Sequence, residues 1–272
     1  MTTAPAPAPA PASPARPRLA HAVASEWTKL ISVRSTVWTL GTMAFLVVAA
    51  GMLAVSLTRP EDYQRMPYTA PAMFGLLVGQ LPVILLGVLS ITSEHGTGLI
   101  RSTFTAAPDR LRVLTAKYLV FSGTAFLTVT GAVFLVAVTA AIVNGGAGAG
   151  PHSSSEWVRA LAGCAYVTLL GVLGLAVGSL VRHSAGTIVL MLGLVTLPPV
   201  IGGMLSIWPA LEPVGRVILL YNAPVALLQL FGVAGEGGEI RQTSDLAQIG
   251  LLLVVTAATM CASYWTVSRR DL

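Results

Sequence analysis

Histidine and cysteine, the side chains most often used as metal ligands and nucleophiles, are few and scattered in this sequence. They are His21, His95, His152, His183, Cys164 and Cys261. No H-E-x-x-H or C-x-x-C motif occurs, and no G-x-x-x-x-G-K-[ST] loop is present to hold a nucleotide phosphate. We therefore predict that this chain has no catalytic residues, no metal site, no disulfide and no bound cofactor.

The nearest approach to a catalytic pair is Glu94 beside His95, but neighbouring residues on a helix point in different directions. These two residues lie at the start of the longest polar interruption between the early apolar segments, residues 93–117. This connector holds four of the sixteen Lys and Arg residues, namely Arg101, Arg110, Arg112 and Lys117. Because Lys and Arg beside a membrane span resist translocation, a basic connector between two spans is expected to stay in the cytoplasm.

Residues within the connector favour a short helix that presents apolar side chains. Thr97 is expected to cap this helix and Pro108 to end it. Its apolar residues are Leu99, Ile100 and Phe104. A helix of this kind, lying parallel to the membrane, would dock a soluble partner, although an ordinary solvated loop fits the same residues.

The composition of the chain indicates that most of it lies in lipid. The 272 residues are 54% hydrophobic and 10% charged, with a mean hydropathy of +0.78, whereas soluble domains carry about 25% charged residues. The net charge of +5 is concentrated in short loops beside apolar runs. This placement is typical of orientation in a membrane, so we expect membrane lipid and no nucleic acid as a partner.

The apolar runs predict an all-α integral membrane protein with six transmembrane helices and both termini in the cytoplasm. In this topology eleven of the sixteen Lys and Arg residues fall on the inner side, as the orienting rule requires. The expected spans are about 37–57, 72–92, 118–143, 156–180, 185–207 and 248–267.

Two segments precede the first span. Residues 1–18 alternate Pro and Ala, so we expect a disordered cytoplasmic tail rather than a secretory signal. Residues 19–35 have apolar side chains at helical spacing and predict an amphipathic helix along the inner membrane surface, with Trp27 at the interface. The polar residues Glu26, Lys29 and Arg34 are expected to project away from that apolar face. A simple extension of the first span is the alternative.

The region between the last two spans is also unusual. The apolar run 217–231 is too short to cross the bilayer and is interrupted by Tyr221, Asn222 and Pro224. We interpret it as a re-entrant hairpin or a pair of short helices that enters the membrane from outside.

Two pairs of glycines recur at the spacing that lets helices pack closely. They are Gly75 and Gly79 in the second span, and Gly174 and Gly178 in the fourth. The pairs are compatible with packing within one subunit or with an interface between subunits.

The sequence around the connector resembles the cytoplasmic loop of type 2 ABC exporter permease subunits. Such loops have a Glu closely followed by Gly-Thr, a short helix, a Pro turn and a Lys that enters the third span. These features fall here on Glu94, Gly96, Thr97, Pro108 and Lys117. Residues 25–38 resemble the entry segment of the same family and residues 179–190 its tight turn between spans four and five, so the resemblance covers the chain after the Pro-rich tail.

The resemblance implies a permease subunit in the plasma (inner) membrane that pairs with a second permease subunit, identical or different. Two separate ABC ATPase subunits, carrying ATP and Mg, would bind below it. The resemblance also implies extracellular re-entrant helices between spans five and six. The docking residues would be Glu94, Gly96, Thr97, Leu99, Ile100, Arg101, Phe104, Pro108 and Lys117.

The function expected from this resemblance is ATP-driven export of a small amphipathic compound, a peptide or a lipid. An ion-coupled secondary transporter that works without an ATPase is the main alternative, and a membrane-embedded enzyme or sensor is a third. The expected spans lack deep ionisable residues, which argues against proton coupling. Carriers that use backbone carbonyls and broken helices are not excluded by this observation.

Overall fold

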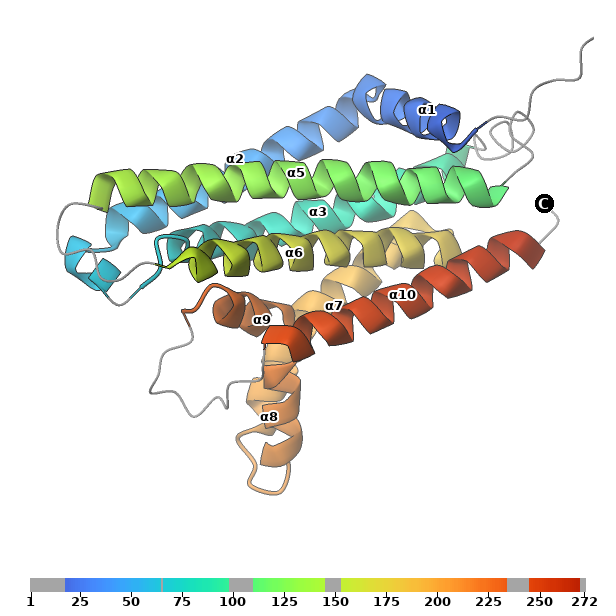
Figure 1. Ribbon diagram of the computed structural model, residues 1–272. Coiled ribbons are helices and arrows are strands. Elements are labelled where there is room, and N and C mark those ends of the chain that lie inside the picture. The colour runs from blue at the N-terminus through green and yellow to red at the C-terminus, as the bar shows by residue number, and fades with distance from the viewer. Residues whose placement is uncertain (1–17, 65, 98–109, 145–152, 234–244, 270–272) are drawn as a thin grey trace, which may run out of the picture.

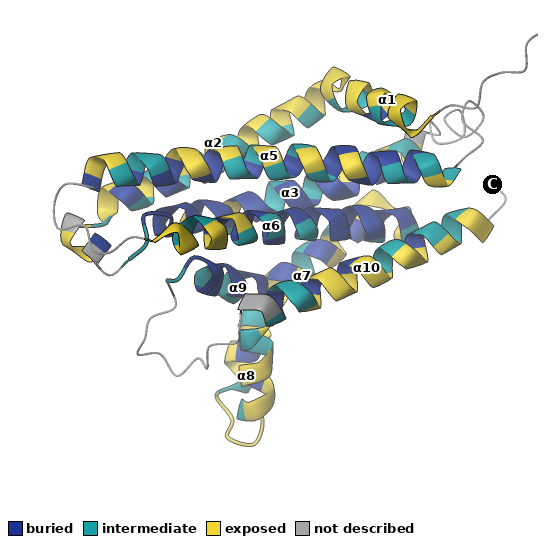
Figure 2. Cartoon of the chain, viewed as in Figure 1, coloured by how far each residue is buried: buried dark blue, intermediate teal, exposed yellow. Residues whose placement is uncertain are grey.

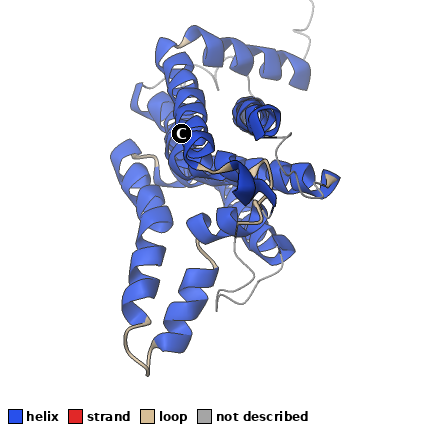
Figure 3. Ribbon diagram, turned by 90° about the vertical axis from the view of Figure 1, so that its left-hand side faces the viewer, coloured by secondary structure: helices blue, strands red, loops and turns tan. Residues whose placement is uncertain are grey.

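The computed structural model describes residues 18–64, 66–97, 110–144, 153–233 and 245–269, and within these ranges every regular element is a helix (Figures 1 and 3). The elements are α1 (Leu19–Ser32), α2 (Arg34–Leu57), the 3-10 helix η1 (Pro60–Gln64), α3 (Ala70–Thr97), α5 (Arg110–Asn144), α6 (Ser154–Val181), α7 (Ser184–Leu205), α8 (Glu212–Leu220), α9 (Ala223–Leu230) and α10 (Asp245–Arg269).

Six helices in the described part of the chain are long and apolar enough to cross a membrane, namely α2, α3, α5, α6, α7 and α10. Each contains one of the predicted spans, except that α7 ends at Leu205 rather than at residue 207. Pro209 follows shortly after, and proline disfavours helical backbone in the residue before it. The prediction of an all-α chain with six apolar spans is therefore confirmed for these residues.

The helices α3 and α6 form the centre of the bundle, and the other spans surround them. Of the apolar window in each helix, 72% is buried in α6 and 61% in α3, against 17% in α7 and in α10. Figure 2 shows the same contrast, with dark blue along α3 and α6 and yellow along α10. The outer faces of the peripheral helices are apolar, which is the surface that lipid requires.

The predicted packing glycines lie where α3 approaches its neighbours. A Cβ on Gly75 would overlap the backbone of Val47 in α2, and Gly79 faces the Val47 side chain. On the other side of α3, Gly174 and Gly178 of α6 lie against residues 84–92 of α3. At these four positions the close approach is therefore between helices of one chain.

The first helix, α1, leaves the bundle at a break in the chain. Val33 has extended backbone (φ −83°, ψ 108°) between α1 and α2, so the two helices do not form one continuous rod (Figure 1). Trp27 and Ile31 are half-exposed on α1, and the position of this helix at the membrane interface stays a prediction. Glu26 is only 4% exposed, so this polar side chain is buried in the bundle rather than exposed to solvent.

One end of the bundle gathers the segments that flank the connector. Figure 1 shows α1, the carboxyl end of α3, the amino end of α5 and the carboxyl end of α10 at that end. The connector itself, residues 98–109, lies outside the described residues. Helix α5 has 35 residues and is therefore about 50 Å long, longer than the roughly 30 Å hydrocarbon core. The first turns of α5 can thus extend beyond the hydrocarbon core into the membrane–water interface while remaining helical.

The run 217–231 covers the end of α8 and all of α9, and these two short helices meet at an angle of 59°. Asn222 lies at the break, where its Oδ1 accepts a hydrogen bond from Val225 N (3.0 Å) and its Nδ2 donates one to Leu219 O (2.6 Å). Pro224 occupies the first turn of α9, where a missing N–H costs little. The predicted pair of short helices is present, with its break at the residues that the sequence indicated, and its entry into the membrane from outside stays a prediction.

Candidate functional site

Four charged side chains from three helices meet where the connector begins and ends. We call Glu26 and Lys29 of α1, Glu94 of α3 and Lys117 of α5 the ion cluster. Glu94 lies near the end of α3, and Lys117 lies about two turns into α5. The two residues therefore flank residues 98–109 on either side.

The positive and negative groups of the ion cluster alternate. Lys117 Nζ lies 2.6 Å from Glu26 Oε2 and 2.8 Å from Glu94 Oε1. Lys29 Nζ lies 2.7 Å from Glu26 Oε1 and 3.6 Å from Glu94 Oε1. Each carboxylate is thus shared by two ammonium groups, and the cluster has no net charge. Lys117 Nζ also donates a hydrogen bond to Ser90 O at 3.4 Å.

Much of the ion cluster is buried. The side chains of Glu26 and Lys117 are 4% and 8% exposed, whereas that of Lys29 is 37% exposed. Burial by itself would raise the pKa of Glu26, but the charge and hydrogen bond of Lys117, with the hydrogen bond from Lys29, outweigh it and hold that pKa below its usual value. Burial likewise opposes the charge on Lys29, but Glu26 raises the pKa of Lys29 above its usual value.

A second polar contact lies close to Lys117 along the same helix. Tyr118 OH donates to Ser263 Oγ of α10 at 3.3 Å, and Ser263 Oγ lies 2.6 Å from Ser179 Oγ of α6. One turn away, Thr115 Oγ1 lies 3.0 Å from Tyr264 OH of α10. Ion pairs therefore connect the first turns of α5 to α1 and α3. Hydrogen bonds connect the same turns to α10 and, through Ser263, to α6.

The structure places the predicted connector residues in two groups. Glu94, Gly96 and Thr97 belong to the last turns of α3, and Lys117 belongs to α5. The helix α3 thus continues through Gly96 to Thr97. The remaining predicted docking residues lie outside the described residues, namely Leu99, Ile100, Arg101, Phe104 and Pro108.

On the first helices, Trp27 is half-exposed and Lys29 joins the ion cluster, while Arg34 is the exposed first residue of α2. No motif in the sequence indicates directly that Glu26 pairs with Lys117. The available signal was the presence of opposite charges at the two ends of the connector, together with another acidic residue on the preceding amphipathic helix.

The ion cluster joins three helices through paired charges. Its two ammonium groups and two carboxylates neutralise one another. The part of the chain that the structure describes contains no group of three or more His, Cys, Asp and Glu side chains that could hold a metal ion. His183 instead caps α7, where its Nδ1 accepts a hydrogen bond from Gly186 N at 3.0 Å.

The described residues form six long apolar helices of the kind found in multi-pass membrane proteins, with an ion cluster at one end of the bundle. No family model matches the sequence, and no curated protein matches it.

Proposed function

We propose that this chain is the permease subunit of an ATP-driven exporter, with the connector between α3 and α5 as its docking element. The observation that carries the proposal is the ion cluster, because Lys117 binds both Glu94 across the connector and Glu26 on α1. A push on the connector would therefore move α1, α3 and α5 together. The resemblance of residues 91–119 to permease loops supports the same assignment.

In this proposal the energy comes from two separate ATPase subunits that hold ATP and Mg, and a second permease subunit completes the transport path. The connector, α1 and both termini face the cytoplasm of a cell bounded by the plasma (inner) membrane. The broken pair α8 and α9 enters the membrane from outside. The cargo is a small amphipathic compound, a peptide or a lipid, because the described spans offer apolar surface and few charges.

The proposal is tested by purifying the chain with an ATPase encoded beside it. We expect the two proteins to co-purify, and Leu99→Ala with Arg101→Ala to lower transport-coupled ATP hydrolysis. The matched control is Arg216→Ala, which changes an exposed arginine that pairs with Glu212 on the same helix, α8. Failure to co-purify, together with unchanged hydrolysis in the connector variant, would contradict the proposal.

An ion-coupled secondary carrier is the second candidate, and the broken pair α8–α9 favours it. Interrupted helices supply backbone groups that bind substrates and ions in such carriers. Near this break Gln248 Nε2 donates to Leu220 O at 3.0 Å and also to Gln229 Oε1. Uptake or release by vesicles that contain only this chain, driven by an ion gradient without ATP, would favour the carrier over the exporter.

A further inference from the structure

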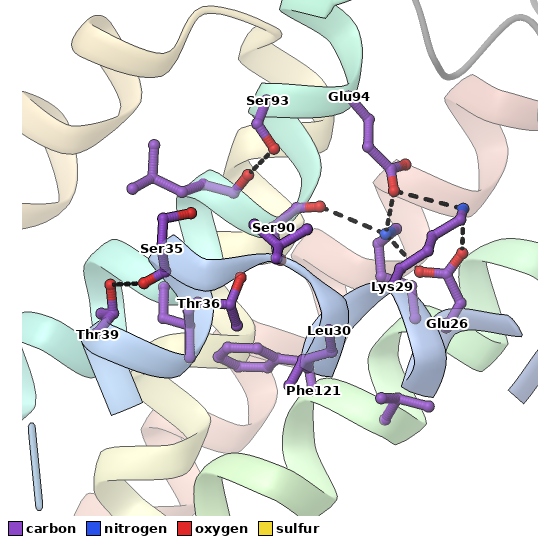
Figure 4. Close-up of a pocket in the computed structure, with 15 residues that line it drawn as sticks. Glu26, Lys29, Leu30, Ser35, Thr36, Thr39, Ser90, Ser93, Glu94 and Phe121 are labelled. Carbon is purple, nitrogen blue, oxygen red and sulfur yellow. Dashed lines mark hydrogen bonds and ion pairs between the residues drawn. The ribbon is translucent and has the colours of Figure 1, made fainter. Parts of the chain in front are cut away.

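A cavity of 520 Å³ lies beside the ion cluster, between α1, the start of α2, and the facing parts of α3 and α5 (Figure 4). Its volume falls within the range of about 300–1,000 Å³ that is usual for small-molecule sites. The cavity exists because the chain breaks at Val33, which turns α1 away from α2 and leaves a space under the bend.

The lining of the cavity is amphipathic. Its apolar wall is formed by Leu30, Leu86, Leu89, Val120 and Phe121. Figure 4 shows Glu26, Lys29 and Glu94 at one end of the cavity, and Ser35, Thr36 and Thr39 at the other. A ligand that fits this lining needs an apolar portion along the wall and a polar group at the charged end.

The polar group of such a ligand would be an anion. Lys29 is the most exposed of the four charged side chains, at 37%, whereas Glu26, Glu94 and Lys117 are 4–13% exposed. The most exposed charged group among the lining residues is therefore an ammonium group. The start of α2 adds to this preference, because it has no side-chain cap and no acidic residue in its first turn.

The mouth of the cavity lies where a membrane lipid would reach it. Leu89 and Val33 line the cavity and are 39% and 46% exposed, so apolar surface continues from the cavity to the outside of the bundle. Trp27 and Ile31 on the exposed side of α1 mark a helix that suits the membrane interface. At that depth the headgroup region and the acyl chains of the bilayer meet.

We infer that the cavity binds one anionic phospholipid, with its phosphate beside Lys29 and an acyl chain along Leu86, Leu89 and Phe121. The lipid would contact α1, α2, α3 and α5 at once, so its presence would set how α1 lies against the bundle. The inference requires only that the chain is embedded in a membrane. It does not depend on the proposed exporter function.

The experiment uses the full chain in phosphatidylcholine nanodiscs that contain a trace of phosphatidylglycerol with a photoreactive diazirine on one acyl chain. After irradiation, mass spectrometry of peptides should locate adducts on residues 86–90 and 117–121. Thr39→Trp should fill the cavity and lower these adducts by about tenfold, the effect of losing roughly 1.4 kcal/mol of binding. Thr196→Trp is the matched control, since the hydroxyls of Thr39 and Thr196 each donate a hydrogen bond to the carbonyl four residues earlier, at 2.8 Å.

A second arm tests the headgroup and does not depend on the filled cavity. Lys29→Gln should lower the adducts from the phosphatidylglycerol probe by about tenfold relative to a diazirine diacylglycerol that lacks phosphate, as expected for losing a charged hydrogen bond. Lys29→Arg should retain the preference for the phosphatidylglycerol probe over the diacylglycerol probe. Size-exclusion chromatography checks that each variant is folded.

Two results would overturn the inference. Equal cavity adducts in Thr39→Trp and Thr196→Trp, or adducts confined to the outer faces of α7 and α10, would show that the acyl chain does not occupy the cavity. If Lys29→Gln keeps the preference for the phosphatidylglycerol probe over the diacylglycerol probe, the phosphate does not bind beside Lys29. All measurements are made without an ATPase, so a failed exporter assay leaves their outcome unaffected.

Discussion

Lys117 Nζ lies 2.6 Å from Glu26 Oε2, although 91 residues separate the two in the chain. The contact joins the first helix to the start of the third span. Because Lys117 also binds Glu94, it connects the two ends of the connector to each other and to α1. The four charges that make these contacts lie on three helices, so the helices are held in one arrangement at this end of the bundle.

Removing Lys117 should destabilise the protein strongly. In Lys117→Met, the buried carboxylates of Glu26 and Glu94 lose their shared partner, and breaking a buried ion pair in this way costs about 3–5 kcal/mol. We expect a lower melting temperature in thermal denaturation followed by size-exclusion chromatography.

The matched control is Arg216→Met, because Arg216 forms an exposed pair with Glu212 on one helix. Such exposed pairs contribute at most about 1 kcal/mol. The double variant Glu26→Gln with Lys117→Met should recover part of the loss, since it leaves Lys29 beside Glu94. Equal melting temperatures for Lys117→Met and Arg216→Met would show that the ion cluster is not a buried network.

Gly75→Ala should push α2 and α3 apart and lower the stability of the protein. The added Cβ would overlap the Val47 backbone, which cannot move aside as a flexible side chain can. Overpacking of this kind costs about 1–3 kcal/mol, and the same thermal assay measures it. Gly131→Ala on α5 is the control, because a Cβ there meets nothing within 4 Å. A melting temperature unchanged by Gly75→Ala would contradict the close approach of the two helices.

Docking of α1 should be insensitive to pH near neutrality and should weaken at both extremes. The lowered pKa of Glu26 stabilises docking above the ordinary value of 4.5, and this contribution is lost as the pH falls through the lowered pKa. The raised pKa of Lys29 stabilises docking below the ordinary value of 10.5, and this contribution is lost as the pH rises through the raised pKa.

A spin label reports this docking when it is attached at Leu30→Cys in a Cys261→Ser background. Cys261 is exposed and must be removed, whereas Cys164 is buried. The label should become mobile only at pH values below about 4.5 or above about 10.5, outside the window given by the two ordinary pKa values. In a Glu26→Gln variant the acid transition should disappear. A mobility change centred between pH 6 and 8 would mean that other groups control docking.

Residue 101 should face the cytoplasm. Arg101→Cys in the Cys261→Ser background should react with an impermeant maleimide only after the cells are permeabilised. Ser155→Cys, in the first turn of α6 at the opposite end of the bundle (Figure 1), should react in intact cells. The opposite labelling pattern would invert the topology and remove the basis for an ATPase docked at the connector.

Much of the fold could be predicted from the sequence because membrane spans are a local property. A run of about 20 apolar residues suffices to cross a bilayer, and all six spans were recognised from such runs. The break between α8 and α9 was also predictable, because Asn222 and Pro224 act on the backbone beside them. Helix ends were less accurate, since α5 continues through polar residues that hydropathy assigns to a loop.

The sequence by itself determined that this chain lies in a membrane as six apolar helices, and that its longest basic loop follows the second span. Only the tertiary structure decided that Glu26 is buried against Lys117, which also pairs with Glu94, rather than exposed on a polar helix face. The physical reason is that hydropathy depends on successive residues, whereas an ion pair between helices depends on how each helix is rotated and how closely the helices approach. The rotation and the approach of the helices are set by contacts such as that of Gly75 with Val47 and by the break at Val33. These features depend on how the whole bundle packs.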